Sequence, residues 1–568
     1  MYTPSPASWN DQVIYSIIID RFNPGELGPR IDANLTLQMR HGGTLAGITA
    51  KLDYIVELGV TTIMLSPVQT NPDISMPGFE CYHGYGVVDF LAVDPHLGTS
   101  LDLKQLIEKC HAKGIFVILD FLVNHTGPVF DYIGDPMFSE SPEKKDIGGW
   151  RYQLKPQELL QREHFSLKGV IRNWDDMVQV RSADFPPNFR RLATENPRTQ
   201  DILISVLQYW MLEFDIDGFR LDAVRHVDPG FLTRVSDEIR SYASSKLQKH
   251  DFLLIGECSS GSFSEINEFL VSPGPNLQSM YNYPDFRRTV SALHGKSPTR
   301  ELEKSFHEMS EAMGEHVHKT LRFLDNHDVY RFLNLVDDEA ISYPAIGYLL
   351  FSIGMPMLYY GIEQSYRQNY SDSFIENAAA PSDPENREPM FNEKGGSSFN
   401  TSSVIFRVIQ KLNRVRKSHP VLRRGLQVVR WSDVTGPGIF AFSKLYECEE
   451  AIVVLNTART TKAVTFYIDT RTIAIGSELR DLLDYSYFVK TEITGCAVDS
   501  MQAVTVEVPA SSERSTGIRV LVVKEMSPRG SLSPKLAQSP KLAQSPRGSQ
   551  SPKVAQSPKV AQSPRGAR

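Results

Sequence analysis

Charged side chains follow several short apolar segments, and the pair Arg220 and Asp222 is the most informative of these. Arg220 lies near the end of the apolar segment 214–221, and Asp222 follows the segment directly. Side chains alternate along a strand, so Arg220 and Asp222 project to the same side. A guanidinium beside a carboxylate favours the ionised form and holds it in place, which suits a nucleophile. A purely structural ion pair at the end of a strand is the alternative.

Two further carboxylates, Glu257 and Asp328, also follow apolar segments. Glu257 comes directly after the wholly apolar residues 252–256, so burial should raise its pKa. A carboxyl that keeps its proton, next to one that stays ionised, is the pair that cleavage of a glycosidic bond requires. Other side chains near strand ends join them: Tyr85, His125, Arg220 and His327.

The elements that must position these residues alternate between strands and helices. Seven apolar strands are readable, at about 13–19, 60–65, 114–120, 214–221, 252–256, 320–324 and 355–360, and a weak one lies near 280–283. Amphipathic helices between parallel strands predict an α/β fold, here a (β/α)8 TIM barrel. The barrel is expected over 1–126 and 201–419, with an inserted B domain at 127–200 after strand three. Short β-like runs predict an antiparallel β-domain at 420–525.

Residues 526–568 form a separate, basic segment. Seven hexads of the type Ser-Pro-Lys/Arg run from Ser527, and such a composition predicts disorder. We interpret it as a solvated tail, with a phosphate-accepting or polyanion-binding tail as the alternative. The tail carries eight basic residues, so the rest of the chain has a charge of −15 (52 basic and 67 acidic residues). Nucleic acid is therefore an unexpected partner.

The cysteine content and the first residues of the sequence indicate a cellular compartment. Five scattered cysteines suggest neither a disulfide framework nor a zinc site, and the first residues contain no secretory signal, so we expect a cytoplasmic protein. The uncharged stretch 343–362 is long enough to span a membrane. Gly354 and Pro356 divide it, and we interpret it as a buried helix followed by a buried strand.

Seven motifs, in order, carry a family resemblance. They are 59–67, 82–85, 120–125, 218–226, 256–257, 323–328 and 354–361. Together they resemble glycoside hydrolase family 13, the α-amylase family, over residues 13 to about 525. The resemblance implies that Asp222 is the nucleophile, Glu257 the general acid/base and Asp328 the stabiliser of the transition state. It implies substrate-binding roles for Tyr85, His83, His125, Arg220, Arg225, His226 and His327. Asp120 and Asp325 are expected to brace the barrel mouth.

A calcium ion is common in this family between the barrel and the B domain. The resemblance would place it at Asn124, a B-domain Asp and the backbone near His226. Arg191 stands where the Asp is expected, and Asp184 is the substitute candidate. The chemistry itself requires no cofactor.

The function implied is a retaining glycosidase that cleaves α-1,4 bonds of starch, glycogen or maltooligosaccharides. An exo-α-glucosidase or a transglycosylase of the same family is the alternative, because water exclusion depends on loop shape. A catalytically silent binding subunit is disfavoured because all three carboxylates are present. The sequence of residues 189–197 does not indicate which glycosidic linkage the enzyme prefers. The sequence predicts no oligomeric state.

Overall fold

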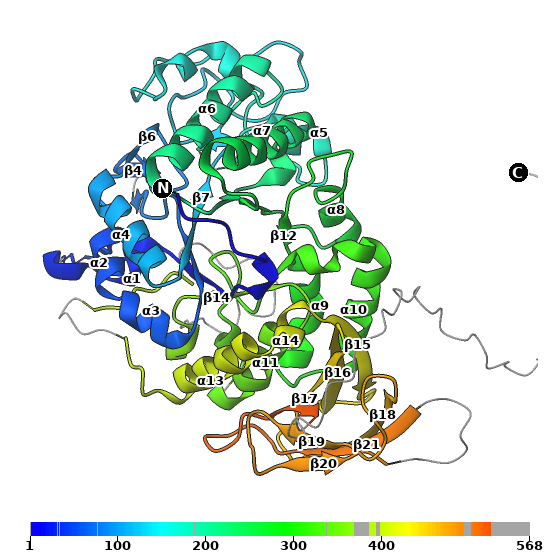
Figure 1. Cartoon of the computed structure of the whole chain (residues 1–568). Helices are drawn as coiled ribbons and strands as arrows, with labels where there is room; N and C mark the ends of the chain where they lie inside the picture. Colours follow the sequence, from blue (N-terminus) through cyan, green and yellow to red (C-terminus); the bar gives the residue numbers. More distant parts are fainter. Residues whose placement is uncertain are drawn as a thin grey trace, which may run out of the picture. The chain divides into compact units, whose positions relative to one another are not determined.

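The computed structural model describes residues 2–523, except 31, 33, 77, 187, 337, 368–385, 393–397 and 493–500. The hexad segment therefore lies outside the described residues. The described chain forms one compact unit that ends at Lys524. Its centre is a closed barrel of parallel strands in the order β1-β14-β13-β12-β11-β10-β7-β2 (Figure 1). The predicted (β/α)8 fold is confirmed.

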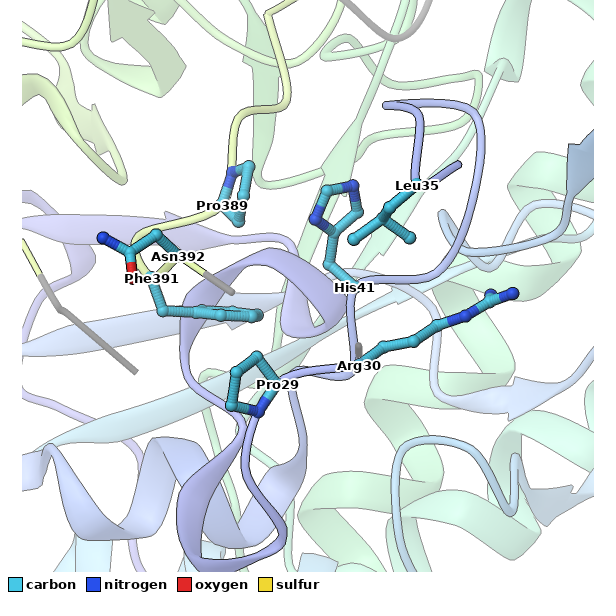
Figure 2. A pocket seen from close by; sticks show the side chains of 7 residues that line it. All are labelled: Pro29, Arg30, Leu35, His41, Pro389, Phe391 and Asn392. Carbon is cyan, nitrogen blue, oxygen red and sulfur yellow. The ribbon is translucent and has the colours of Figure 1, made fainter. Parts of the chain in front are cut away.

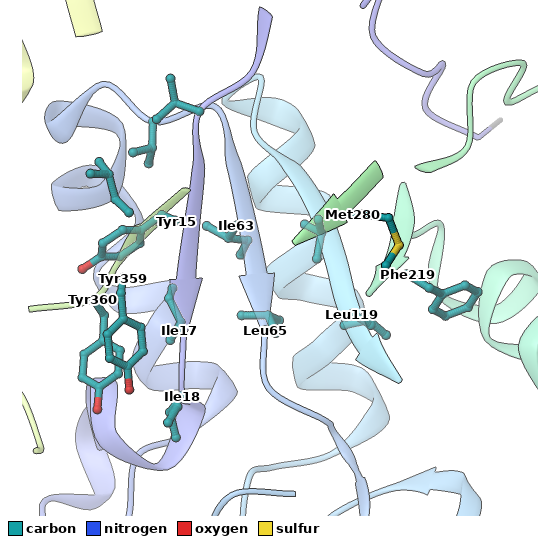
Figure 3. Packing of buried hydrophobic residues seen from close by; sticks show 14 of the residues in the cluster. Tyr15, Ile17, Ile18, Ile63, Leu65, Leu119, Phe219, Met280, Tyr359 and Tyr360 are labelled. Atoms are coloured by element: carbon teal, nitrogen blue, oxygen red, sulfur yellow. The ribbon is translucent and has the colours of Figure 1, made fainter. Parts of the chain in front are cut away.

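The barrel strands are short and apolar. Their bounds are β1 Ile14–Ile17, β2 Thr62–Leu65, β7 Phe116–Phe121, β10 Gly218–Leu221, β11 Leu253–Gly256, β12 Ser279–Tyr281, β13 Thr320–Phe323 and β14 Met355–Tyr359. Strand β12 is the one that was weakest in the sequence, with three residues. Residues pointing inward, such as Ile14, Ile118 and Leu321, form a core inside the barrel. Residues pointing outward, such as Ile63, Leu119 and Phe219, pack against the helices (Figure 3).

Helices surround this barrel. They are α1 Ile19–Phe22, α2 Leu45–Ala50, α3 Leu52–Leu58, α4 Ser100–Ala112, α6 Pro197–Phe214, α7 Pro229–Leu247, α8 Phe263–Glu268, α9 Tyr283–Leu293, α10 Arg300–Met313, α11 Ser342–Phe351, α13 Val404–Ser418 and α14 Pro420–Arg424. Sequence signals explain several boundaries. Asn196 caps α6, Pro197 occupies its first turn, and Asp215 ends it in a left-handed conformation. The stretch 343–362 divides into α11 and β14, as predicted.

The register between β7 and β10 brings two charged residues together. Gly218 pairs with Ile118 and Arg220 with Asp120, so the latter two side chains enter the barrel mouth side by side. A Cβ at Gly218 would lie 2.7 Å from the carbonyl oxygen of Leu253. Glycine therefore permits the close approach of β10 to β11, where Gly218 pairs with Leu253.

Residues between β7 and α6 form a loop-rich insertion. Its regular elements are α5 Met177–Ser182 and the pair β8 His125–Thr126 with β9 Arg190–Arg191. Smaller strand pairs lie on the loop after β2: β3 Gln69–Thr70 with β6 Asp89–Val93, and β4 Ile74–Met76 with β5 Phe79–Glu80. The insertion is thus tied to the barrel through β8, which follows β7 directly.

The C-terminal part is antiparallel, as predicted. One sheet has the order β15-β16-β17-β22-β19-β20, and β18 pairs with β21. The bounds are β15 Leu426–Ser432, β16 Ile439–Tyr446, β17 Glu449–Asn456, β18 Lys462–Asp469, β19 Glu478–Asp481, β20 Phe488–Lys490, β21 Met501–Val508 and β22 Ile518–Val523. Among the described helices, none is both long and apolar enough to cross a bilayer.

Candidate active site

A cavity of about 870 Å³ opens at the carboxyl ends of the barrel strands. Nearly every residue proposed from the sequence for catalysis or substrate binding lines it: His83, Tyr85, His125, Asp222, Arg225, His226, Glu257, His327 and Asp328. Arg220, the remaining one, lies beneath them, fully buried. A smaller cavity of about 430 Å³ is lined by Pro29, Arg30, Leu35, His41, Pro389, Phe391 and Asn392 (Figure 2). None of the predicted residues lines it, so the larger cavity is the candidate active site.

Arg220 is the centre of a charge network at the floor of this cavity. Its Nη1 donates to Asp222 Oδ1 at 2.6 Å and to both oxygens of Asp120 at 2.8 and 2.9 Å. Burial opposes ionisation of Asp222, but the Arg220 guanidinium, together with His125 and His327, outweighs burial, and the pKa of Asp222 lies below its ordinary value. Burial raises the pKa of Asp120 to about 6. Asp222 therefore ionises at a lower pH than Asp120 does.

Glu257 lies on the other side of the same guanidinium. Its Oε2 is 3.7 Å from Arg220 Nη2 and accepts a hydrogen bond from the backbone N–H of Ala223 at 3.0 Å. Ala223 has a φ of 50°, a strained conformation for a residue with a Cβ, and this directs its N–H at Glu257. Burial, with the nearby charges of Asp222 and Asp328, raises the pKa of Glu257 to about 8. The two carboxyls thus differ in protonation at neutral pH.

Asp328 borders the cavity with a side chain that is 40% exposed. Its oxygens lie 3.2 Å from His327 Nε2, 3.4 Å from the Tyr283 hydroxyl and 3.5 Å from Arg387 Nη2. Burial lowers the pKa of His327 to about 4, so its imidazole is neutral at pH 7. Asp328 is therefore more exposed to solvent than Glu257, and several hydrogen-bond donors lie around it.

Aromatic rings form one wall. Tyr85 stacks on His83 and on His327, with ring centroids 5.6 and 5.5 Å apart. The Tyr85 hydroxyl donates to Asp120 at 2.7 Å, and the Tyr85 carbonyl oxygen lies 3.2 Å from His125 Nε2. His125 stacks on Phe189 at 4.8 Å. An apolar face with polar edges suits a sugar ring, whose C–H faces pack on aromatics while its hydroxyls bond to polar groups.

Arg225 and His226 lie toward the insertion. Arg225 Nε donates to Glu265 at 2.8 Å, and His226 Nδ1 contacts the carbonyl oxygen of Val180 in α5 at 2.8 Å. Phe185 and Trp174 pack edge-on against His226 at 5.3 and 5.8 Å. The insertion therefore contributes its own aromatic side chains to the cavity.

The residues proposed for calcium are engaged differently from metal ligands. Asp184 accepts hydrogen bonds from the Tyr132 hydroxyl at 2.8 Å, from the backbone N–H of Arg191 at 2.9 Å and from Arg190 Nη1 at 3.4 Å. Asn124 Oδ1 is buried and has no hydrogen-bond partner among the described residues. Because Asp184 is already paired with the buried Arg190, one orphaned amide oxygen does not fit a calcium ion, which needs several oxygen ligands. No cluster of three or more His, Cys, Asp or Glu suited to a metal occurs within the described ranges.

Several side chains in the cavity were missed by sequence reasoning. Arg387 and Tyr283 contact Asp328. Phe185, Phe189 and Trp174 also line the cavity and extend its aromatic wall. Tyr283 lies just after the weak strand β12, so its position at a strand end was a signal that could have found it. Arg387 belongs to no periodic segment, and nothing in the sequence indicated its role.

Comparison with known proteins agrees with this geometry. The model of the α-amylase catalytic domain matches residues 12–425. A β/α-amylase of Paenibacillus polymyxa is 30% identical over 79% of this chain and 34% of its own length. A cyclomaltodextrin glucanotransferase of Thermoanaerobacterium thermosulfurigenes is 28% identical over 79% of this chain and 60% of its own length. The chain thus spans only part of these curated relatives.

One solved structure matches a larger share of this chain than these relatives do. The crystal structure of the α-amylase from Geobacillus thermoleovorans, complexed with acarbose, matches with a TM-score of 0.72 and 28% identity. The match covers 92% of this chain and 100% of that one. The sequence comparison and the structural comparison therefore both find amylases that are similar to this chain.

Proposed function

Since this chain belongs to the α-amylase family, we propose that it is a retaining glycosidase acting on α-1,4 bonds of starch- or glycogen-type glucans and maltooligosaccharides. The observation that carries the proposal is the guanidinium of Arg220 between Asp222 and Glu257. Of these two carboxyls, Asp222 has a lowered pKa and Glu257 has a pKa of about 8. Retaining hydrolysis needs this division between a nucleophile and an acid.

In this mechanism the glycosidic oxygen takes its proton from Glu257 while Asp222 attacks the anomeric carbon. The bond to the leaving group breaks, and a glycosyl ester forms on Asp222. Glu257, now ionised, removes a proton from water, which attacks the ester and releases the sugar with its configuration retained. Asp328 stabilises the positive charge that develops on the ring, and neutral His327 and His125 bind its hydroxyls.

Transglycosylation is the second candidate. Phe185 and Trp174 place apolar surface beside His226, where an incoming sugar could displace water. A related protein named a cyclomaltodextrin glucanotransferase supports this candidate. An exo-α-glucosidase is the remaining alternative.

The test is a time-resolved product profile from starch, maltoheptaose, pullulan, isomaltose and sucrose. Short α-configured oligosaccharides from starch and maltoheptaose alone support the amylase. Products longer than maltoheptaose support the transferase, and glucose alone supports the exo-glucosidase. Turnover of none of the five would overturn the proposal.

Variants then assign the roles. We expect Asp222→Asn and Glu257→Gln to lose at least ~10³-fold in kcat, because each removes a group that acts in the transition state. Asp53→Asn is the matched control, since its side chain is 92% exposed on α3. Near-normal turnover in both active-site variants would refute the assignment.

We also propose the domain division 1–126 with 201–419, 127–200 and 420–525, and a cytoplasmic location. The cysteines that the structure describes, Cys81, Cys110, Cys258 and Cys448, are all thiols rather than disulfides, which supports a reducing compartment. Fractionation of cells producing the full chain tests the location, and recovery from the medium would contradict it.

A further inference from the structure

Lys444 is a buried lysine far from the candidate active site in the fold. It belongs to β16, and its side chain is fully buried. Phe440 and Phe442, on the same face of β16, belong to the large core that the barrel helices share. Ile439 and Ala441, on the opposite face, belong to the core of the C-terminal sheets. Alternation along the strand therefore directs Lys444 toward the barrel.

Lys444 is surrounded by donors that lack acceptors. Its Nζ has no hydrogen-bond partner within the described part of the chain, and the same holds for Gln427 Nε2, Arg416 Nε and Ser352 Oγ. All four residues are at least nine-tenths buried. Buried polar groups nearly always have a partner, and leaving one unpaired destabilises the folded state. Four such groups in one region call for an acceptor.

Strand pairing and hydrogen bonds bring these residues together. Gln427 pairs with Lys444 across β15 and β16, so their side chains share a face. Gln427 Oε1 accepts from the backbone N–H of Ile353 at 2.9 Å, which places Ser352 next to it. Arg416 Nη1 donates to the carbonyl oxygen of Leu350 at 2.7 Å, in the last turn of α11 and two residues before Ser352. The four residues thus lie near residues 350–353.

The charge of this region is positive. The charges of Arg416 and Arg322 both act against the protonated form of Lys444, whose pKa burial already lowers strongly. Arg322 is neutralised by Asp285 at 2.6 Å. Arg416 instead donates to the carbonyl oxygens of Leu350, Leu422 and Asn10. A buried guanidinium without a bonded carboxylate is costly unless a negative charge compensates it, and Lys444 can keep its proton here only beside such a charge.

We propose that Lys444, Gln427, Arg416 and Ser352 form a binding site for a small inorganic anion of halide size between the barrel and the C-terminal sheets. Each donor would direct a proton at the anion, and the anion would keep Lys444 charged. Because the site lies between two cores, its ligand would stabilise the folded chain rather than take part in the reaction.

Bromide offers a direct test with the full-length protein. Crystals soaked in bromide should show an anomalous peak in contact with Lys444 Nζ. A peak at surface sites only, or non-anomalous water density beside Lys444, would overturn the proposal. This measurement needs no variant, so it stands even if substitutions at Lys444 do not fold.

Thermal unfolding offers an independent test. At constant ionic strength, replacing gluconate by chloride should raise the Tm of the wild-type protein with the logarithm of chloride concentration, because a ligand that binds only the folded state stabilises it. Lys444→Met should lose this response. Lys462→Met, an exposed lysine on β18 of the same part of the chain, should retain it. An equal chloride response in both variants would refute the site.

Discussion

Tyr85 and His327 contact each other twice: their rings stack at 5.5 Å, and the Tyr85 hydroxyl lies 2.8 Å from His327 Nε2. Tyr85 belongs to the loop after β2, whereas His327 follows β13. The same hydroxyl donates to Asp120, which holds Arg220. One tyrosine therefore links the aromatic wall to the charge network beneath it.

We expect Tyr85→Phe to lower kcat/KM about tenfold, because it keeps the ring but removes the hydrogen bonds. Tyr85→Ala removes the stacking surface as well and should cost about 100-fold or more. Steady-state kinetics with maltoheptaose give both values. Equal activity of the two variants would show that the ring does not contact substrate.

Activity should fall on the alkaline side near pH 8. Glu257 must carry its proton to act as an acid, and burial raises its pKa to about 8, so deprotonation above that value stops the first step. On the acid side, Asp222 must be ionised. Its lowered pKa moves that limb below the usual range of an aspartate.

The pH dependence of kcat/KM measures both limbs. Glu257→Gln with an α-glycosyl fluoride, whose leaving group needs no proton, is the matched experiment. In that variant the alkaline limb should disappear from the glycosylation step. An alkaline limb that persists would assign it to another group.

Arg387→Lys should lower kcat/KM about 10–100-fold with little change in Tm, since lysine cannot reproduce a guanidinium fork. Arg387 Nε donates to the His327 carbonyl oxygen at 3.1 Å while Nη2 faces Asp328 at 3.5 Å. We interpret it as a positioning residue for Asp328. If so, kcat falls more than KM rises, whereas a change confined to Tm would indicate a structural role alone.

The junction of the insertion with the barrel should depend on arginine rather than on a metal. Arg190 donates to the Phe130 carbonyl oxygen and to Asp184, and both charged groups are buried. Arg190→Met should destabilise the fold by about 3–5 kcal/mol, because it leaves a buried carboxylate without its cation. Arg198→Met is the control, with a side chain that is 78% exposed.

Chelation tests the same junction without a substitution. We expect the Tm and activity of the wild-type protein to be unchanged by EDTA or by added calcium, because Asp184 already has three donors. A Tm that falls in EDTA and returns with calcium would contradict this prediction.

Removal of residues 527–568 should leave kcat/KM and Tm unchanged. Every residue that lines the candidate site lies between 79 and 387, and the compact unit that contains it ends before the hexads begin. Loss of activity on truncation would assign the hexads a catalytic role, and altered partitioning among cell fractions would support a polyanion-binding tail.

The local pattern of the sequence determined the elements and the nucleophile candidate. Short apolar runs became barrel strands, and α6 begins at Pro197 because its Asn196 cap and its proline act within one turn. The spacing of Arg220 and Asp222 placed them on one side of β10, since alternation is a property of a single strand. The burial of Glu257 followed from the apolar run before it.

Only the tertiary structure decided which distant residues meet. Asp120 holds Arg220 because β7 and β10 pair in one particular register, and register depends on the whole barrel. The insertion has no periodicity, so the contacts of Arg190 with Asp184 had no local signal. Arg387 reaches Asp328, and Lys444 turns toward the barrel, through packing between segments that lie far apart in the chain. Such contacts depend on how completed elements pack, which no short stretch of sequence encodes.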